Sequence, residues 1–112
     1  MNQLYLTRRQ QIATDQIVYL ESESNYTCIY TTAQVRIVAT LTLGSILERL
    51  DTQTFLRVNR SHILNLSYIS TCRLENNKLI FRLQDGQEFT ASRRRLRGVQ
   101  KTLNKTSKDL SW

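Results

Sequence analysis

The stretch FLRVNRSHILNL, residues 55–66, combines two properties that usually belong to different parts of a protein. Its apolar residues alternate as they would in a packed strand. Its middle carries four polar side chains, those of Asn59, Arg60, Ser61 and His62. A core strand does not need this polar cluster, and a surface loop does not need so many apolar neighbours. We interpret the stretch as two strands, over 54–58 and 63–64, that anchor an exposed polar link.

Short runs of β-branched and aromatic residues, typical of strands, lie on both sides of this stretch. The expected strands are 17–22, 25–32 and 35–41 before it, and 68–75, 78–84 and 87–91 after it. Asn76–Asn77 and Asp85–Gly86 predict tight hairpin turns, because these residues tolerate a positive φ. The predicted fold class is therefore mainly β, built from small antiparallel sheets, with the first three strands forming a meander.

Two segments show the period of a helix instead. The spacing of Leu43, Ile46, Leu47 and Leu50 predicts a short helix over 43–50. Thr42 is its expected N-cap, and Ser45 with Glu48 is expected to support the first turn. A second short helix is predicted over 93–103, where Leu96, Val99 and Leu103 share one face and Ser92 is a plausible N-cap.

The positive charge is concentrated near the C-terminus. The chain of 112 residues has a formal net charge of +7. Residues 1–92 are nearly neutral, whereas residues 93–108 contain seven lysines and arginines and no acidic residue. Such a patch suits a polyanion, with nucleic acid first among the candidates. A solvated basic tail that only aids solubility is the alternative that charge alone leaves open.

Several other classes of protein are not indicated. The sequence has no apolar run long enough to cross a membrane, and no secretion signal is expected at its start. Cys28 and Cys72 are too few for a disulfide framework or a zinc site, which suggests thiols in a reducing cytosol. No cofactor motif is present, and the single histidine, His62, has no acid close to it in sequence. We therefore expect a cytoplasmic protein that is not an enzyme and needs no cofactor, metal or small-molecule substrate.

The order of these blocks resembles the LytTR DNA-binding domain of bacterial transcription regulators. The resemblance rests on IVYLESESNYTCIYT, an amphipathic helix, FLRVNRSHILNLSYI, a hairpin and ASRRR, and it covers roughly residues 15–103. Two positions depart from the family's pattern. Asn59 stands where the family usually has His, and His62 stands where it usually has Tyr or Phe.

The resemblance implies an elongated all-β fold whose loops enter successive major grooves of double-stranded DNA. It implies base contacts at about Thr27, Arg60 and Arg94. Contacts to bases or phosphates are implied around these positions, at Asn25, Tyr26, Arg57, Asn59, Ser61, Ser92, Arg93, Arg95 and Arg97. Arg57 could instead brace the loop, and Tyr26 could instead belong to the core.

The chemistry of these residues agrees with that implication. An arginine such as Arg60 can contact guanine O6 and N7 together, which contributes roughly 1–3 kcal/mol of discrimination between bases. Consecutive arginines cannot all point one way, so some of Arg93–Arg95 are expected on phosphates. A general RNA or single-strand binder and a basic protein-interaction module remain alternatives. The first would need exposed aromatic platforms, whereas most aromatic residues here lie in strand patterns.

The predicted domain organisation has three parts. Residues 1–14 form an N-terminal extension, residues 15–103 form the LytTR-like domain, and residues 104–112 form a basic, frayed tail. The family resemblance further implies a role as the output domain of a two-component response regulator. Two copies are expected to bind together on repeated DNA sites.

Overall fold

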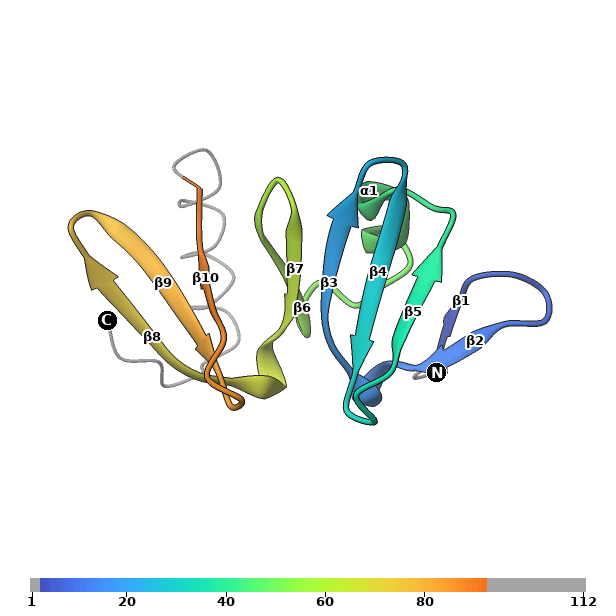
Figure 1. Ribbon diagram of the computed structural model, residues 1–112, viewed down its shortest axis with the longest axis horizontal. Helices are drawn as coiled ribbons and strands as arrows, with labels where there is room; N and C mark the ends of the chain where they lie inside the picture. The colour runs from blue at the N-terminus through green and yellow to red at the C-terminus, as the bar shows by residue number, and fades with distance from the viewer. Residues whose placement is uncertain (1–2, 93–112) are drawn as a thin grey trace.

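A five-stranded antiparallel sheet lies at the centre of the molecule (Figure 1). The computed structural model describes residues 3–92 of the chain. The sheet has the order β5–β4–β3–β7–β6. Its strands are β3 (Ile17–Glu23), β4 (Tyr26–Thr31), β5 (Arg36–Ala39), β6 (Phe55–Asn59) and β7 (His62–Asn65). The first three form the expected meander, and the stretch 55–66 supplies the other two.

A separate three-stranded sheet follows, and its two hairpins confirm the turn predictions. Its strands are β8 (Ile69–Glu75), β9 (Lys78–Leu83) and β10 (Glu88–Thr90), with β9 in the middle. Asn76 and Asn77 have φ values of 52° and 64°, and Gly86 has a φ of 96°. These residue types adopt a positive φ more readily than others, which allows such short connections.

The stretch 55–66 contributes to both hydrophobic cores of the molecule. Phe55 and Ile63 belong to the core that also contains helix α1. Leu56, Val58 and Leu64 belong to the core formed with the three-stranded sheet. Neighbouring residues of a strand point to opposite faces, so one hairpin can anchor both cores. The dense alternation of apolar residues in this stretch therefore reflects burial on two sides.

Helix α1 (Leu43–Leu47) is shorter than the predicted helix over 43–50. The N-cap prediction is confirmed, because the Thr42 hydroxyl accepts a hydrogen bond from the Ser45 N–H at 3.2 Å. The predicted role of Glu48 in the first turn is wrong, since Glu48 is the C-cap residue. Beyond Leu47 the chain continues in tight turns, which still bury Leu50 on the apolar face.

The N-terminal residues contain a hairpin that the sequence analysis did not anticipate. Strands β1 (Gln3–Tyr5) and β2 (Gln11–Ala13) pair with each other. Leu4, Leu6 and Ile12 are buried in the core around α1. Strands of three residues are too short to show a periodic pattern, so the hairpin could not be recognised from sequence.

Two short 3₁₀ turns lead into the long strands, η1 (Thr14–Gln16) before β3 and η2 (Leu66–Tyr68) before β8. Buried Asn65 connects them, because its Nδ2 donates to the Ile17 carbonyl at 2.7 Å and its Oδ1 accepts from the Ser67 N–H at 2.9 Å. The predicted helix over 93–103 and the tail over 104–112 lie outside the described residues. Within residues 3–92, no helix is long and apolar enough to span a membrane.

Candidate nucleic-acid interface

Three segments named by the sequence analysis lie along one edge of the molecule (Figure 1). They are the β3–β4 turn at Ser24 and Asn25, the β6–β7 turn at Arg60 and Ser61, and the end of β10 up to Ser92. Backbone hydrogen bonds connect them. The Ser22 N–H donates to the Ser61 carbonyl at 2.8 Å, and the Ser92 N–H donates to the Val58 carbonyl at 3.0 Å. The β6–β7 turn is thus tied to both of its neighbours.

The β6–β7 turn is braced from inside. Asn59 Oδ1 accepts a hydrogen bond from the Ser61 N–H at 2.8 Å, which closes the turn locally. The Arg57 guanidinium donates to the Arg60 carbonyl at 2.7 Å, so the bracing alternative for Arg57 has a structural basis. The Arg60 side chain is exposed and forms no ion pair with any residue between 3 and 92. Its guanidinium is therefore presented to solvent from a well-supported turn.

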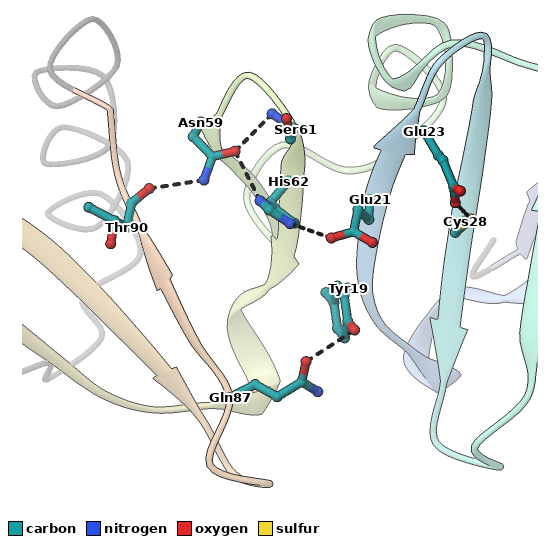
Figure 2. A network of polar contacts seen from close by, with 9 residues as sticks. All are labelled: Tyr19, Glu21, Glu23, Cys28, Asn59, Ser61, His62, Gln87 and Thr90. Atoms are coloured by element: carbon teal, nitrogen blue, oxygen red, sulfur yellow. Dashed lines mark hydrogen bonds and ion pairs between the residues drawn. The ribbon is translucent and has the colours of Figure 1, made fainter.

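Asn59 and His62 form the centre of a polar network beside this turn (Figure 2). Asn59 Nδ2 donates to the Thr90 carbonyl of β10 at 2.9 Å. His62 Nδ1 lies 3.1 Å from Asn59 Oδ1, and His62 Nε2 lies 2.8 Å from Glu21 Oε2 of β3. The His62 ring also packs edge-on against Phe89, with ring centroids 4.8 Å apart. The network therefore joins β3, β6, β7 and β10.

His62 has no acidic residue close to it in sequence, but it has one in space. Glu21 precedes it by 41 residues. The pairing of β3 with β7 nevertheless places Glu21 directly opposite His62, and the pairing of β6 with β7 places Asn59 opposite it on the other side. Long-range strand pairing leaves no mark in local sequence. The only local indication of where the Glu21 side chain points was the alternation of side chains along β3, which puts Glu21 and Tyr19 on the same face.

The implied base contact at Thr27 is not compatible with its position in the structure. Its side chain is 0% exposed, and its hydroxyl donates to the Leu41 carbonyl at 2.7 Å. A base cannot reach this side chain in the described structure. Asn25 and Tyr26 are exposed instead, with Tyr26 at 49%, so Tyr26 is not a core residue.

The remaining implied contacts divide between the described residues and those beyond them. Ser92 is partly buried, and its backbone is tied to β6. Arg93, Arg94, Arg95 and Arg97 lie outside the described residues. The structure thus brings together the first two candidate segments and the start of the third.

The ionisable groups with shifted pKa values are strand residues, and none of them lies in the three candidate segments. Burial raises the pKa of Tyr19 to about 12 and that of the Cys72 thiol to about 12. Burial also raises the pKa of the Cys28 thiol, which donates to Glu23 Oε2 at 3.2 Å. Hydrogen bonds from the Arg73 guanidinium lower the pKa of Glu88. The described part of the chain contains no group of three or more His, Cys, Asp or Glu residues placed to hold a metal ion.

Comparison with known proteins agrees with this architecture. The family model described as the LytTr DNA-binding domain matches residues 7–104. A search of curated proteins gave no match. Among solved structures, the chain is similar to the LytTr DNA-binding domain of a methyl-accepting/DNA response regulator from Bacillus cereus. That similarity has a TM-score of 0.76 and 19% identity, and it covers 90% of this chain and 94% of that one.

The solved domain confirms the fold class that the sequence predicted, which is mainly β with three small antiparallel sheets and one α-helix among the described residues. The family model extends over most of the chain, including every candidate segment. The chain therefore belongs to the family of LytTR DNA-binding domains.

Proposed function

We propose that this domain reads the sequence of double-stranded DNA through the three candidate segments, placed in successive major grooves, and thereby regulates transcription. The observation that carries the proposal is the edge on which the segments lie, held together by the hydrogen bonds from Ser22 to Ser61 and from Ser92 to Val58. An edge with fixed spacing between its turns can match the spacing of grooves on one face of a duplex. Recognition would then rest on the β3–β4 and β6–β7 turns together with the basic segment that follows Ser92.

Arg60 is the residue we assign to base contact. Its side chain is exposed at the tip of the β6–β7 turn, while its carbonyl is held by Arg57. A guanidinium presented in this way can donate to two acceptors of one guanine. Arg57 then acts as a brace. We assign Asn25, Tyr26 and Ser61 to contacts with bases or phosphates, because these residues flank the exposed turns.

The basic segment that begins after Ser92 supplies the third contact. We propose that Arg94 contacts a base and that Arg93, Arg95 and Arg97 contact phosphates. Phosphate contacts release counterions, so affinity should fall steeply as salt concentration rises. The domain would act as the output module of a response regulator, with two copies on repeated sites.

Arg60→Ala tests the base contact directly. Duplexes selected from a random pool by the unaltered domain would define its preferred site and the spacing of any repeats. We expect Arg60→Ala to weaken binding to that site by about 10- to 100-fold, equivalent to roughly 1–3 kcal/mol, and to weaken binding to random duplex much less. Fluorescence anisotropy at a fixed salt concentration measures both affinities.

Arg82→Ala is the matched control. Arg82 is also exposed, but it lies on β9 close to the turn at Gly86, whereas the turn at Asn76 and Asn77 is at the opposite end of β9. The Arg82→Ala substitution removes the same charge as Arg60→Ala and should change both affinities little. Equal losses on selected and random duplex in Arg60→Ala would remove Arg60 from base recognition. Single-stranded DNA or RNA that outcompetes every duplex would overturn the proposed function.

A further inference from the structure

This inference rests on the proposed function. We propose that Asn59 and His62 are positioning residues that hold the three candidate segments in place for DNA binding. They do so fully only when both ring nitrogens of His62 carry a proton. The structure places these two side chains in direct contact, with Asn59 Oδ1 and His62 Nδ1 3.1 Å apart. They therefore form one unit.

The orientation of the Asn59 amide follows from its backbone partners. The Thr90 carbonyl can only accept a hydrogen bond, so the atom 2.9 Å from it must be the donating Nδ2. The Ser61 N–H can only donate, so the atom 2.8 Å from it must be the accepting Oδ1. The oxygen of Asn59 therefore faces His62, and it has no proton to offer the ring.

His62 consequently lies between two oxygen atoms. Asn59 Oδ1 faces Nδ1, and Glu21 Oε2 faces Nε2 at 2.8 Å. An ionised carboxylate only accepts hydrogen bonds, and a neutral imidazole carries one N–H. A neutral ring would thus leave one nitrogen lone pair against an oxygen lone pair. Only the doubly protonated ring donates to both partners, and its charge also pairs with Glu21.

The groups around His62 come from each neighbouring strand. Glu21 is the titratable group that contacts it from β3, and Asn59 contacts it from β6. Phe89 packs on the ring from β10 and does not titrate. The His62 side chain is 20% exposed and that of Glu21 is 38% exposed, so protons can reach the pair from solvent.

The network reaches all three candidate segments. Glu21 lies three residues before Ser24 of the β3–β4 turn, and Asn59 directly precedes Arg60. Thr90, whose carbonyl Asn59 holds, lies three residues before Arg93 of the basic segment. Losing one ring proton would release the link to Glu21 or the link to Asn59. Either loss loosens the relative placement of the segments without removing any residue that touches DNA.

The predicted consequence is a pH dependence of specific binding. The additional contact exists while the ring is doubly protonated, so affinity for the selected site should be highest at the acidic end and fall as pH rises. We expect a decrease of about tenfold, the scale of one hydrogen bond to a charged group.

The experiment compares the unaltered domain with Glu21→Gln and His62→Phe between pH 5.5 and 8.5 on the selected duplex and on random duplex. Glutamine can accept from or donate to Nε2, so Glu21→Gln removes the demand for a second proton while keeping a polar partner. His62→Phe keeps a flat ring against Phe89 but has no ring nitrogens. Both variants should lose most of the pH dependence on the selected site.

NMR of the domain without DNA tests the role of His62 independently of the proposed function. The chain contains a single histidine, so its ring ¹⁵N signals are unambiguous. In the unaltered domain, these signals should show both nitrogens protonated over the pH range of strongest specific binding. The Ser61 and Ser22 amide signals should follow the same curve, and they should not follow it in Glu21→Gln.

The possible results separate cleanly. Identical pH profiles for the unaltered domain and both variants on the selected site would overturn the positioning inference while leaving the proposed function standing. Ring signals of a neutral histidine throughout, with unchanging Ser61 amides, would overturn it as well. Failure to select any duplex would count against the proposed function, and the ring and amide signals would still decide whether His62 organises the turns.

Discussion

At the scale of single residues, the side chains of greatest functional interest have roles that depend on distant partners. Thr27 was implied as a base contact, yet its buried hydroxyl donates a hydrogen bond to the Leu41 carbonyl of the loop that follows β5. His62 looked isolated in sequence, yet it meets Glu21 across a strand pair. Asn65 bonds both to the nearby Ser67 N–H and to the distant Ile17 carbonyl, so its amide also joins segments far apart in sequence.

The buried thiol of Cys72 gives a prediction at this scale. Cys72 is 0% exposed, and burial raises its pKa to about 12. The thiolate is the reactive form, so the folded protein at pH 8 should resist alkylation at this position. Mass spectrometry after iodoacetamide treatment would show the modification. Rapid labelling of Cys72 in the folded state, at a rate close to that in denaturant, would contradict its burial.

At the scale of elements, local chemistry predicts the ends of structures well. Asn76–Asn77 and Asp85–Gly86 gave both hairpins of the three-stranded sheet, because positive φ at a turn restricts the residue types available. Thr42 marked the start of α1 for a similar reason, since a hydroxyl at that point satisfies an exposed backbone N–H. The end of α1 was harder to predict, because Leu50 stays buried whether or not the helix continues to it.

The cap of α1 supplies the prediction for this scale. Thr42→Ala removes the oxygen that accepts from the Ser45 N–H at 3.2 Å. We expect the free energy of unfolding to fall by about 0.5–2 kcal/mol, measured by urea denaturation followed by circular dichroism. Thr42→Ser keeps the hydroxyl and should lose much less. A serine variant as unstable as the alanine variant would show that the methyl group, not the cap, is what matters.

At the scale of the whole molecule, the β6–β7 hairpin makes one structure out of two cores. Val58 and Leu64 pack toward the three-stranded sheet, while Phe55 and Ile63 pack toward α1. The same two strands line both cores. If one core unfolded, the apolar side chains of these strands would lose their packing, and the other core would be destabilised. Unfolding should therefore be cooperative across the 43 Å length of the molecule.

Two core substitutions test this coupling. Phe81 lies in one core and Ile46 in the other, and both are 0% exposed. Ile46→Ala should cost about 2–5 kcal/mol and Phe81→Ala about 3–5 kcal/mol of unfolding free energy. Each should shift one common transition, seen equally by circular dichroism and by methyl NMR signals from both cores. A variant that melts only its own core would show that the two halves are independent.

The sequence by itself determined the strands from residue 17 onward, the hairpin turns, the helix cap and the family. These depend on nearest neighbours, through strand alternation, backbone φ preferences and motif order, all of which are written locally along the chain. The tertiary structure decided which side chains are exposed on the edge that carries the candidate segments and which side chains support them. Pairing of β3 with β7 brought Glu21 to His62, the chain after β5 supplied the Leu41 carbonyl that binds buried Thr27, and the hairpin over residues 3–13 completed the core around α1. Such contacts join residues tens of positions apart, and no local pattern encodes the register that brings them together.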